Sequence, residues 1–157
     1  VQTQLAALRD QKAQLLKDEF EYRLGALRTL SSNRATVEAV SKMKVAFANA
    51  SKESARVDDS AALRKSMLEY IETQFGPEFT KRNGAKAPDL AALVDTRDAN
   101  AVRLQHDYIV ANENKLGEKD KLAAAPGPLS YHAMHAQYHS TFERAQKQFG
   151  YYDVFLY

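Results

Sequence analysis

The 157-residue sequence has no cysteine and no tryptophan, and it contains no long apolar run. Without cysteine there can be no disulfide bond, no thiolate nucleophile and no zinc site of the cysteine type. Such a chain is compatible with an oxidising compartment such as a periplasm. None of its apolar stretches approaches the roughly 18–20 residues that span a bilayer, and no signal peptide is visible. The sequence therefore excludes cysteine chemistry and predicts no membrane span within these residues.

Charge of one sign is also missing, because 22 Lys and Arg residues nearly balance 20 Asp and Glu residues. No basic run is interleaved with aromatic residues, which argues against a nucleic-acid groove. The six glycines are scattered, and neither a GxxxxGK phosphate loop nor a GxSxG motif is present. We therefore expect a protein that is not an enzyme and that has no cofactor.

The sequence does contain a series of amphipathic stripes with three- and four-residue spacing, which predict helices. The longest stripe runs from about residue 3 to 30, and its apolar positions are Leu5, Leu8, Leu16, Phe20, Leu24 and Leu27. SSNRAT (31–36) supplies turn and cap residues before a second helix. Further helices are predicted at roughly 37–47, 60–75, 90–94, 98–111 and 130–149, with polar connections at 49–60, 81–89, 112–121 and 123–128. Gly76-Pro77 is expected to stop or kink the third helix, because proline cannot donate a backbone hydrogen bond.

The pattern changes after Gly150, which is expected to end the last helix. In YYDVFLY (151–157), aromatic and β-branched residues alternate between two faces, which is typical of a strand. A single strand cannot form a sheet, and Val1 begins within a helical pattern, so we expect these residues to be part of a longer protein. The predicted fold is mainly α: an elongated helical bundle with a long N-terminal helix, ending in a β-strand.

Three of the four histidines lie close together in the predicted helix 130–149. On a wheel of about 100° per residue, His135 and His139 border the buried face, and His132 lies on its flank, where we expect exposure. The predicted buried face comprises Tyr131, Met134, Tyr138, Phe142, Ala145 and Phe149. His135, His139 and Glu143 have the i, i+4 spacing of metal ligands, but the glutamate of an HExxH helix is missing. Packing at the core boundary is the alternative, and we favour it.

Acidic residues offer little further chemistry. Asp98, Asp107, Glu118 and Asp120 are interpreted as solvated charges on loops and helix faces. The loop 112–121 lacks the alternating acidic ligands and the terminal glutamate of an EF-hand calcium site. We therefore predict no metal.

Five stretches occur in an order that resembles the extracytoplasmic sensor region of bacterial methyl-accepting chemotaxis proteins. They are FGPEF (75–79), PDLAALV (88–94), HDYIVANENKLGEKDKL (106–122), YHAMHAQYHSTFERAQKQFG (131–150) and GYYDVFLY (150–157). Related regions occur in some membrane histidine kinases and cyclases. The likeness covers about residues 60–157, whereas 1–59 match only as a long helix of the kind that leaves a first membrane span.

This resemblance implies a fold, a location and partners. Residues 1–59 would form a membrane-proximal dimerisation stalk, 60–149 a helical sensor module, and 150–157 the first strand of a PAS-like Cache domain. The region would lie in the periplasm and bind a small molecule, or a ligand-loaded periplasmic protein. It would form a homodimer attached to the inner membrane through flanking segments, with no nucleic acid involved.

The resemblance also implies ligand-binding positions, although it leaves open whether they bind a ligand or brace the helices against the sheet. These positions are Tyr108, Asn112, Asn114, Lys119, Asp120, His135, His139, Tyr151, Tyr152 and Asp153. His132 is not part of the pattern.

Two other functions stay open at this point. One is a helical dimerisation or spacer module with no ligand of its own. The other is a metal-dependent enzyme that uses His135, His139 and Glu143, for which elemental analysis would be the test.

Overall fold

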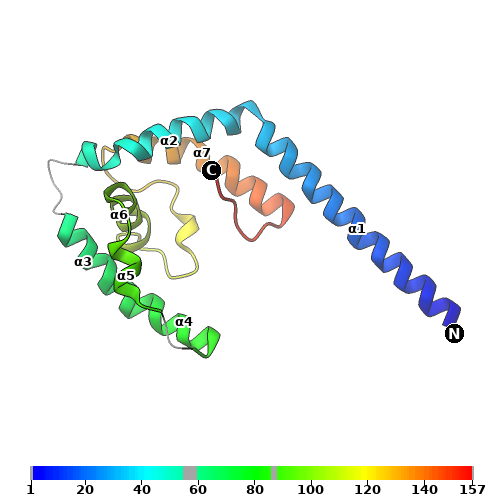
Figure 1. The fold of residues 1–157 in the computed structure, drawn as a ribbon. Coiled ribbons are helices and arrows are strands. Elements are labelled where there is room, and N and C mark those ends of the chain that lie inside the picture. The colour runs from blue at the N-terminus through cyan, green and yellow to red at the C-terminus, as the bar shows by residue number, and fades with distance from the viewer. Residues whose placement is uncertain (1, 55–59, 86–87, 157) are drawn as a thin grey trace. The chain divides into compact units, whose positions relative to one another are not determined.

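The computed structural model describes residues 2–54, 60–85 and 88–156, and 79% of these residues are helical. No strand occurs among them (Figure 1). The elements, with π-helical and 3-10 turns written as η, are α1 (Gln2–Ser32), α2 (Arg34–Ser54), α3 (Ser60–Tyr70), η1 (Ile71–Phe75), α4 (Gly76–Asn83), α5 (Leu90–Asp95), α6 (Ala99–Gln105), η2 (His106–Val110), η3 (Lys119–Lys121) and α7 (Ser130–Phe149).

The predicted fold class is wrong in one respect, because residues 151–156 do not form a strand that enters a PAS-like sheet. Alternation of side chains makes a strand feasible, but a strand is stabilised only by hydrogen bonds to a neighbouring strand. The described residues provide no such neighbour. Other contacts hold the segment: the Tyr151 hydroxyl donates to the Arg23 carbonyl at 3.1 Å, and Gln146 Nε2 donates to the Tyr152 carbonyl at 3.1 Å. Tyr157, the last residue of the predicted strand, lies outside the described residues.

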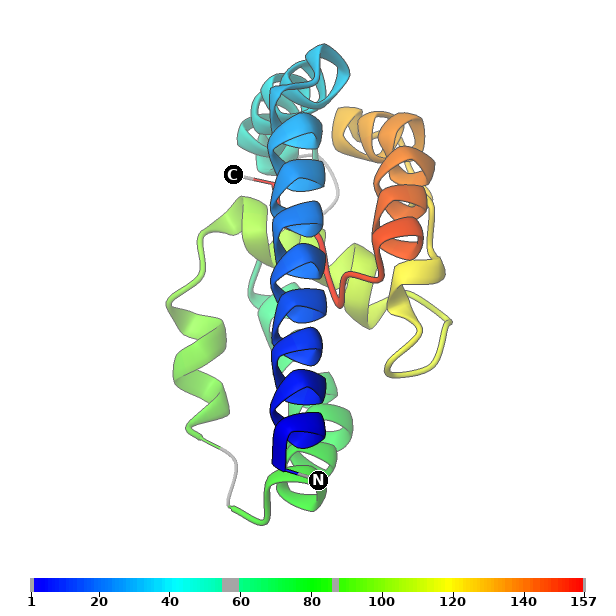
Figure 2. The same ribbon diagram turned by 90° about the vertical axis from the view of Figure 1, so that its right-hand side faces the viewer.

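Asn33 alone separates α1 from α2. Its Oδ1 accepts the Ala35 backbone N–H at 2.8 Å, so Asn33 caps the start of α2, and the turn predicted over 31–36 is confirmed. Figure 2 shows α1 as one continuous helix, as its leucine stripe predicts. Helix α2 continues to Ser54, further than the sequence pattern predicts. Residues 55–59 of the predicted connection lie outside the described residues.

The chain passes Gly76-Pro77 without leaving the helical conformation. The wide turn η1 precedes it, and the Gly76 N–H donates to the Ile71 carbonyl, a π-type bond. Pro77 then lies in the first turn of α4, where a backbone N–H has no helical partner to lose. The helical backbone therefore does not stop at Gly76-Pro77, because a π turn accommodates the proline, and the alternative of a kink stays a prediction. Helix α4 ends at Gly84, whose φ of 64° is the left-handed conformation of a helix C-cap.

Helices α5 and α6 are short and lie beside α3 (Figure 1). Asp98 caps α6 by accepting the Ala101 N–H at 2.9 Å. The Arg64 guanidinium of α3 donates to the carbonyls of Val94 at 2.7 Å and Arg97 at 2.6 Å. These bonds fix α5 and the turn that follows it to α3.

The structure comprises two compact units: Val1–Ser41 with Thr141–Tyr157, and Lys42–Ser140. We call the second the 42–140 unit, and it contains most of the positions singled out by the sequence resemblance. Its apolar core has two clusters, and α2 and α7 each supply residues to both units. One cluster consists of Ala50, Leu104 and Leu129 with Tyr108 and Tyr131, and the other of Met67, Val94 and Val102 with Leu63, Leu68, Ile71 and Val110.

Candidate functional site

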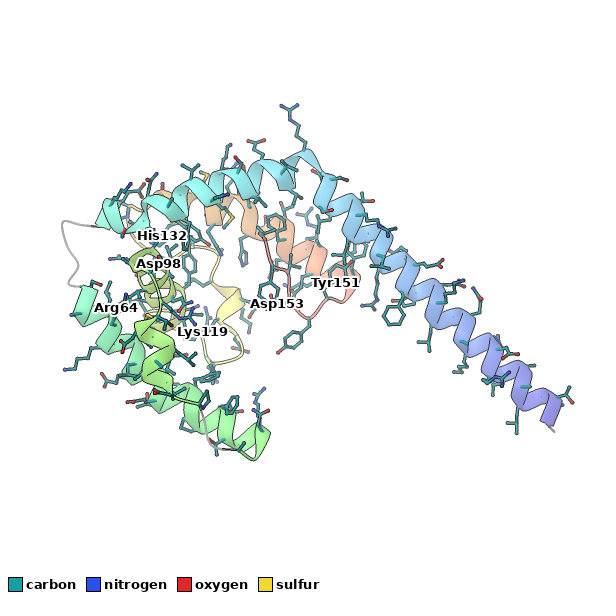
Figure 3. All side chains as sticks on the ribbon, viewed as in Figure 1. Arg64, Asp98, Lys119, His132, Tyr151 and Asp153 are labelled. Carbon is teal, nitrogen blue, oxygen red and sulfur yellow. The ribbon has the colours of Figure 1, made fainter. Side chains whose placement is uncertain are left out.

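The positions singled out by the resemblance in the 42–140 unit meet where η2, the loop 111–129 and the first turns of α7 come together. Figure 3 labels two residues of this region, Lys119 and His132. We call this group the histidine–loop cluster, and it consists of Asp107, Tyr108, Asn112, Lys119, His132, His135 and His139. Each of these residues is placed by the turn, loop or helix to which it belongs.

Asp107 is the charged centre of the cluster. It lies in the π turn η2 and is only 7% exposed. Its Oδ2 accepts a hydrogen bond from Arg103 Nε at 2.8 Å, and its Oδ1 lies 3.3 Å from His106 Nδ1. The interpretation of Asp107 as a solvated charge is therefore wrong. A carboxylate placed four residues after an arginine can pair with it along the helix, and here the pair is buried.

His132 is only 3% exposed, so the predicted exposure of this residue is also wrong. Its Nδ1 lies 3.3 Å from the Tyr108 hydroxyl, and its Nε2 lies 3.3 Å from Asp107 Oδ2. The Nε2 contact does not have the geometry of a hydrogen bond, so this nitrogen has no hydrogen-bond partner among the described atoms. A helical wheel places His132 beside the buried face, but it cannot show that η2 and Gly127 of the loop cover that flank.

His135 and His139 hold the loop against α7. His135 Nδ1 lies 2.6 Å from the Ala123 carbonyl oxygen, and His139 Nε2 lies 2.8 Å from that of Asp120. A carbonyl only accepts, so each of these nitrogens carries the proton. The rings form a row: Tyr108 to His135 at 4.5 Å and His135 to His139 at 5.2 Å between centroids. The predicted position of both histidines at the edge of the buried face is confirmed.

Asn112 and Lys119 close the loop upon itself. Asn112 Nδ2 donates to the carbonyls of Tyr108 at 2.9 Å and Lys119 at 3.0 Å, and its Oδ1 accepts from the Asn114 backbone at 2.9 Å. Lys119 Nζ donates to the Asn112 carbonyl at 2.6 Å and lies 5.3 Å from the centre of the Tyr70 ring. Asn112 is buried, so these bonds keep the loop compact.

The start of α7 is held from α2. Ser130 donates its backbone N–H at 2.7 Å and its hydroxyl at 2.8 Å to the two carboxylate oxygens of Glu53. A carboxylate at a helix N-terminus is stabilised by unpaired N–H groups and by the helix dipole. The orientation of α7, and hence of its histidines, therefore depends on Glu53.

Burial shifts several pKa values in the cluster. It raises the pKa of Tyr108 to about 12, although a backbone hydrogen bond with Ala125 opposes the shift. It lowers the pKa of His132, against the nearby Asp107 carboxylate. It also lowers the pKa of His135, where the Ala123 carbonyl opposes the shift and His139 and His132 add to it. The cluster therefore favours uncharged rings.

Tyr108, His132 and Asp107 are arranged in the order of a proton relay. A relay of this kind needs a nucleophile that is activated, either by a neighbouring base or by a lowered pKa. Burial raises the pKa of Tyr108 instead, so the phenol stays protonated at neutral pH. The arrangement therefore stabilises neutral groups and does not activate Tyr108.

The remaining predicted positions belong to the other unit. Tyr151 bonds to the α1 backbone as described above, and Tyr152 is 98% exposed. The Asp153 side chain accepts the N–H of Val154 at 2.9 Å. The structure thus brings together Tyr108, Asn112, Asn114, Lys119, Asp120, His135 and His139, while Tyr151, Tyr152 and Asp153 form a separate segment.

Two further features bear on the kind of site. Among the described residues, no group of three or more His, Cys, Asp or Glu side chains is placed to hold a metal ion. A hollow of about 390 Å³ lies on α4, lined by Gln74, Pro77, Glu78, Lys81, Arg82 and Leu116. Its charges are partly neutralised, since Arg82 Nε donates to Glu78 at 2.6 Å. This hollow does not include the histidine–loop cluster.

Sequence reasoning missed Arg103, His106 and Asp107 as parts of the site. The signal that could have identified them was the i, i+4 spacing of Arg103 and Asp107 within the stretch that resembles a receptor.

Comparison with protein-family models, curated proteins and solved structures finds no match to this chain. In the part of the chain that the structure describes, none of the helices is sufficiently long and apolar to cross a bilayer.

Proposed function

We propose that this chain is the signal-sensing region of a bacterial transmembrane receptor of the chemoreceptor type. It would lie in the periplasm, bind a small molecule or a ligand-loaded protein, and be attached to the inner membrane by flanking segments. The sequence resemblance motivates the proposal, and one structural observation supports it. Positions of the resemblance between residues 108 and 139 join in one bonded cluster, in which the loop and α7 hold each other.

In this proposal the cluster has two states, one with the loop held on α7 and one with the loop released. The loop is held on α7 mainly by two histidine–carbonyl bonds, whose replacement by bonds to water or to a ligand requires no change of fold. A ligand that binds the loop-held and loop-released forms with different affinity shifts the balance between them. A change at the first turns of α7 then passes along the same helix, because a helix is a stiff element. The receptor output depends on domains outside these residues.

A ligand screen tests this proposal. The purified chain would be screened against amino acids, organic acids and metal ions by thermal shift, and each hit would be measured by calorimetry. We expect at least one compound to raise the melting temperature in a dose-dependent way, since a ligand that binds only the folded state stabilises it. A screen without any hit would contradict the proposal.

Matched variants locate the binding site. Lys119→Met and His139→Leu each remove one polar group of the cluster, and Glu113→Gln changes an exposed side chain of the same loop. We expect the first two to weaken ligand binding by about tenfold or more, equivalent to one lost hydrogen bond to a charged or polar group. Equal affinity in all three variants would place the ligand elsewhere and would contradict a sensing role for the cluster.

A second candidate function is a helical dimerisation module with no ligand of its own, and α1 favours it. The helix exposes eight large apolar side chains by between 43% and 65%: Leu5, Leu8, Leu15, Leu16, Phe20, Tyr22, Leu24 and Leu27. Six of them form a stripe, Leu5, Leu8, Leu16, Phe20, Leu24 and Leu27, and a stripe of this kind on a helix about 46 Å long is typical of helices that pair. Sensing and dimerisation are compatible, because a receptor that dimerises through α1 could still bind a ligand.

Sedimentation equilibrium tests dimerisation. Leu16→Glu places a charge in the middle of the stripe, whereas Gln11→Glu adds the same charge on the far side of the helix, about 140° away. We expect Leu16→Glu to weaken self-association by at least about tenfold, because a buried unpaired carboxylate is unfavourable, and Gln11→Glu to leave it unchanged. A chain that is monomeric at high concentration would rule out the dimer.

A further inference from the structure

The histidine–loop cluster combines two features that together point to control by protons. The loop is attached through ring nitrogens that carry a proton in the neutral histidine, Nδ1 of His135 and Nε2 of His139. The second nitrogen of the His135 ring, Nε2, takes up another proton when the pH falls. Such a proton would create a positive charge in surroundings that favour the neutral ring.

We propose that the loop 111–129 is a proton-operated latch, held on α7 while His135 is neutral and released when His135 is protonated. The inference goes beyond the proposed sensing function, because it assigns the proton as a stimulus in its own right. It applies equally if the unit binds no small molecule.

The surroundings of the row disfavour charge. The groups that face His135 are His139 and Tyr131 on its own helix, Tyr108 on η2, and the carbonyl of Ala123 on the loop. A proton on His135 would place a positive charge in a partly buried ring whose centre lies 5.2 Å from that of His139. Partial burial weakens the screening of this charge by water and disfavours it.

The neighbouring elements carry charges that act mainly on His132. Two charged members of the cluster lie near the histidines, Asp107 on η2 and Lys119 on η3. The charged or titratable groups next to the cluster are Glu53 on α2, Arg103 on α6 and His106 on η2. Burial is the largest influence on His132 and lowers its pKa, Arg103 acts in the same direction, and Asp107 and Glu53 oppose it. Burial likewise lowers the pKa of His135 despite the Ala123 carbonyl. Both shifts favour the neutral, loop-held form.

The direction of the pH dependence follows from these lowered pKa values. The released form takes up protons near the ordinary histidine pKa of about 6.5, whereas the held form takes them up only at lower pH. The held form is therefore fully favoured above about pH 6.5 and loses its advantage as the pH falls towards the lowered pKa. For a histidine that stays neutral in the held form over this whole range, the ratio of released to held form rises by up to about 25-fold from pH 7 to pH 5.

The latch can open without unfolding the rest of the 42–140 unit. Gly127 of the loop packs against His132, with 3.8 Å from an added Cβ position to His132 Cδ2, so release of the loop uncovers this histidine. The apolar cluster around Met67, Val94 and Val102 contains no residue of the loop, whereas Leu129, at the end of the loop, stays packed with Ala50 and Leu104. We therefore expect acid to loosen the loop while α3, α5 and α6 stay protected.

Hydrogen exchange measured by mass spectrometry tests the latch. The chain would be labelled at about pH 7, 6 and 5, with labelling times scaled to the intrinsic exchange rate, and peptides from 111–129 would be compared with peptides from 90–105. We expect loop protection to fall by up to about 25-fold at the lowest pH, with little change in the reference peptides. A corrected change of less than about twofold in the loop would overturn the proposal.

Two variants and one direct titration complete the test. His135→Gln can still donate to the Ala123 carbonyl but cannot titrate, so we expect it to flatten the pH step. His106→Gln removes a histidine of the same unit that lies outside the ring row, and the step should survive. Should His135→Gln fail to fold, proton NMR of the unmodified chain still decides the matter. A His135 pKa at or above about 6.5 would mean that Tyr108 and Ala123 favour the protonated ring, and would overturn the latch.

Discussion

Loss of the Asp107 charge is the sharpest test of how the histidine–loop cluster is held together. Asp107→Asn keeps the size of the side chain but removes the carboxylate that accepts from Arg103 at 2.8 Å. The two side chains are only 9% and 18% exposed, so water does not readily replace the lost contact. Removing one partner of a buried ion pair costs about 3–5 kcal/mol. Asparagine retains one acceptor oxygen, so we expect a loss of about 2–3 kcal/mol in the free energy of unfolding.

Urea unfolding followed by near-ultraviolet circular dichroism measures this loss, because Tyr108, Tyr131 and Tyr138 report on the same unit. In thermal unfolding the same change corresponds to a decrease of roughly 4–12 °C for a chain of this size. The matched control is Glu113→Gln, which neutralises an exposed carboxylate nearby and should change stability by less than about 0.5 kcal/mol.

A double substitution separates pairing from packing. Arg103→Met with Asp107→Leu replaces the ion pair by apolar side chains, and a buried pair replaced in this way is often neutral in stability. We expect the double variant to be more stable than Asp107→Asn alone. The reasoning is refuted if Asp107→Asn is no less stable than Glu113→Gln, since the carboxylate would then contribute nothing as the charged centre of the cluster.

Three further predictions concern the backbone, a tyrosine and a helix cap. Gly127→Ala should lower stability by about 2 kcal/mol, more than the roughly 1 kcal/mol for Gly84→Ala, because φ is 121° at Gly127 and 64° at Gly84; equal melting temperatures would contradict this. Tyr108 should ionise later than the other tyrosines, because burial raises its pKa to about 12. Its neutral form is favoured in the fold, so this contribution to stability is complete below about pH 10 and is lost as the pH rises towards 12. An alkaline absorbance titration should show a late step that Tyr108→Phe removes, and an unchanged curve would refute the assignment. Asp98→Ala should cost about 1 kcal/mol in urea unfolding through loss of the α6 cap, whereas Glu113→Gln should not.

Where local rules decide a structure, the sequence predicts it well. The stripe of α1 and the ends of α7 follow from helical spacing, from the leucines and from Gly150, whose φ is 63°. Asn33 caps α2 because its side chain reaches the backbone two residues further on. Such interactions involve neighbours in the chain, so they can be read from the order of residues.

Features that depend on distant residues were misjudged. His132 lies on the flank of α7, and only the loop and η2, which cover this flank, make it one of the most buried polar residues of the described chain. Asp107 carries no sequence mark of burial beyond its spacing from Arg103. Gly76-Pro77 was expected to stop or kink the helix, but the π turn Ile71–Phe75 carries the helical backbone past these two residues.

The predicted strand over 151–157 shows the limit most clearly. Alternation along a segment determines only which side chains can share a face, while a strand exists only if another strand accepts and donates its backbone hydrogen bonds. In residues 151–156 the contacts come instead from α7 and α1, through Gln146 and Arg23.

By itself, the sequence determined the helical character of this protein, the positions of most helix ends and the placement of His135 and His139 at the edge of a buried face. Tertiary structure alone decided that a loop covers that edge, that Asp107 and His132 are buried beneath it, and that residues 151–156 meet no partner strand among the described residues. The physical reason is the separation along the chain of the residues that interact. Helix formation depends on residues three or four positions apart, whereas burial and strand pairing depend on which distant parts of the chain meet.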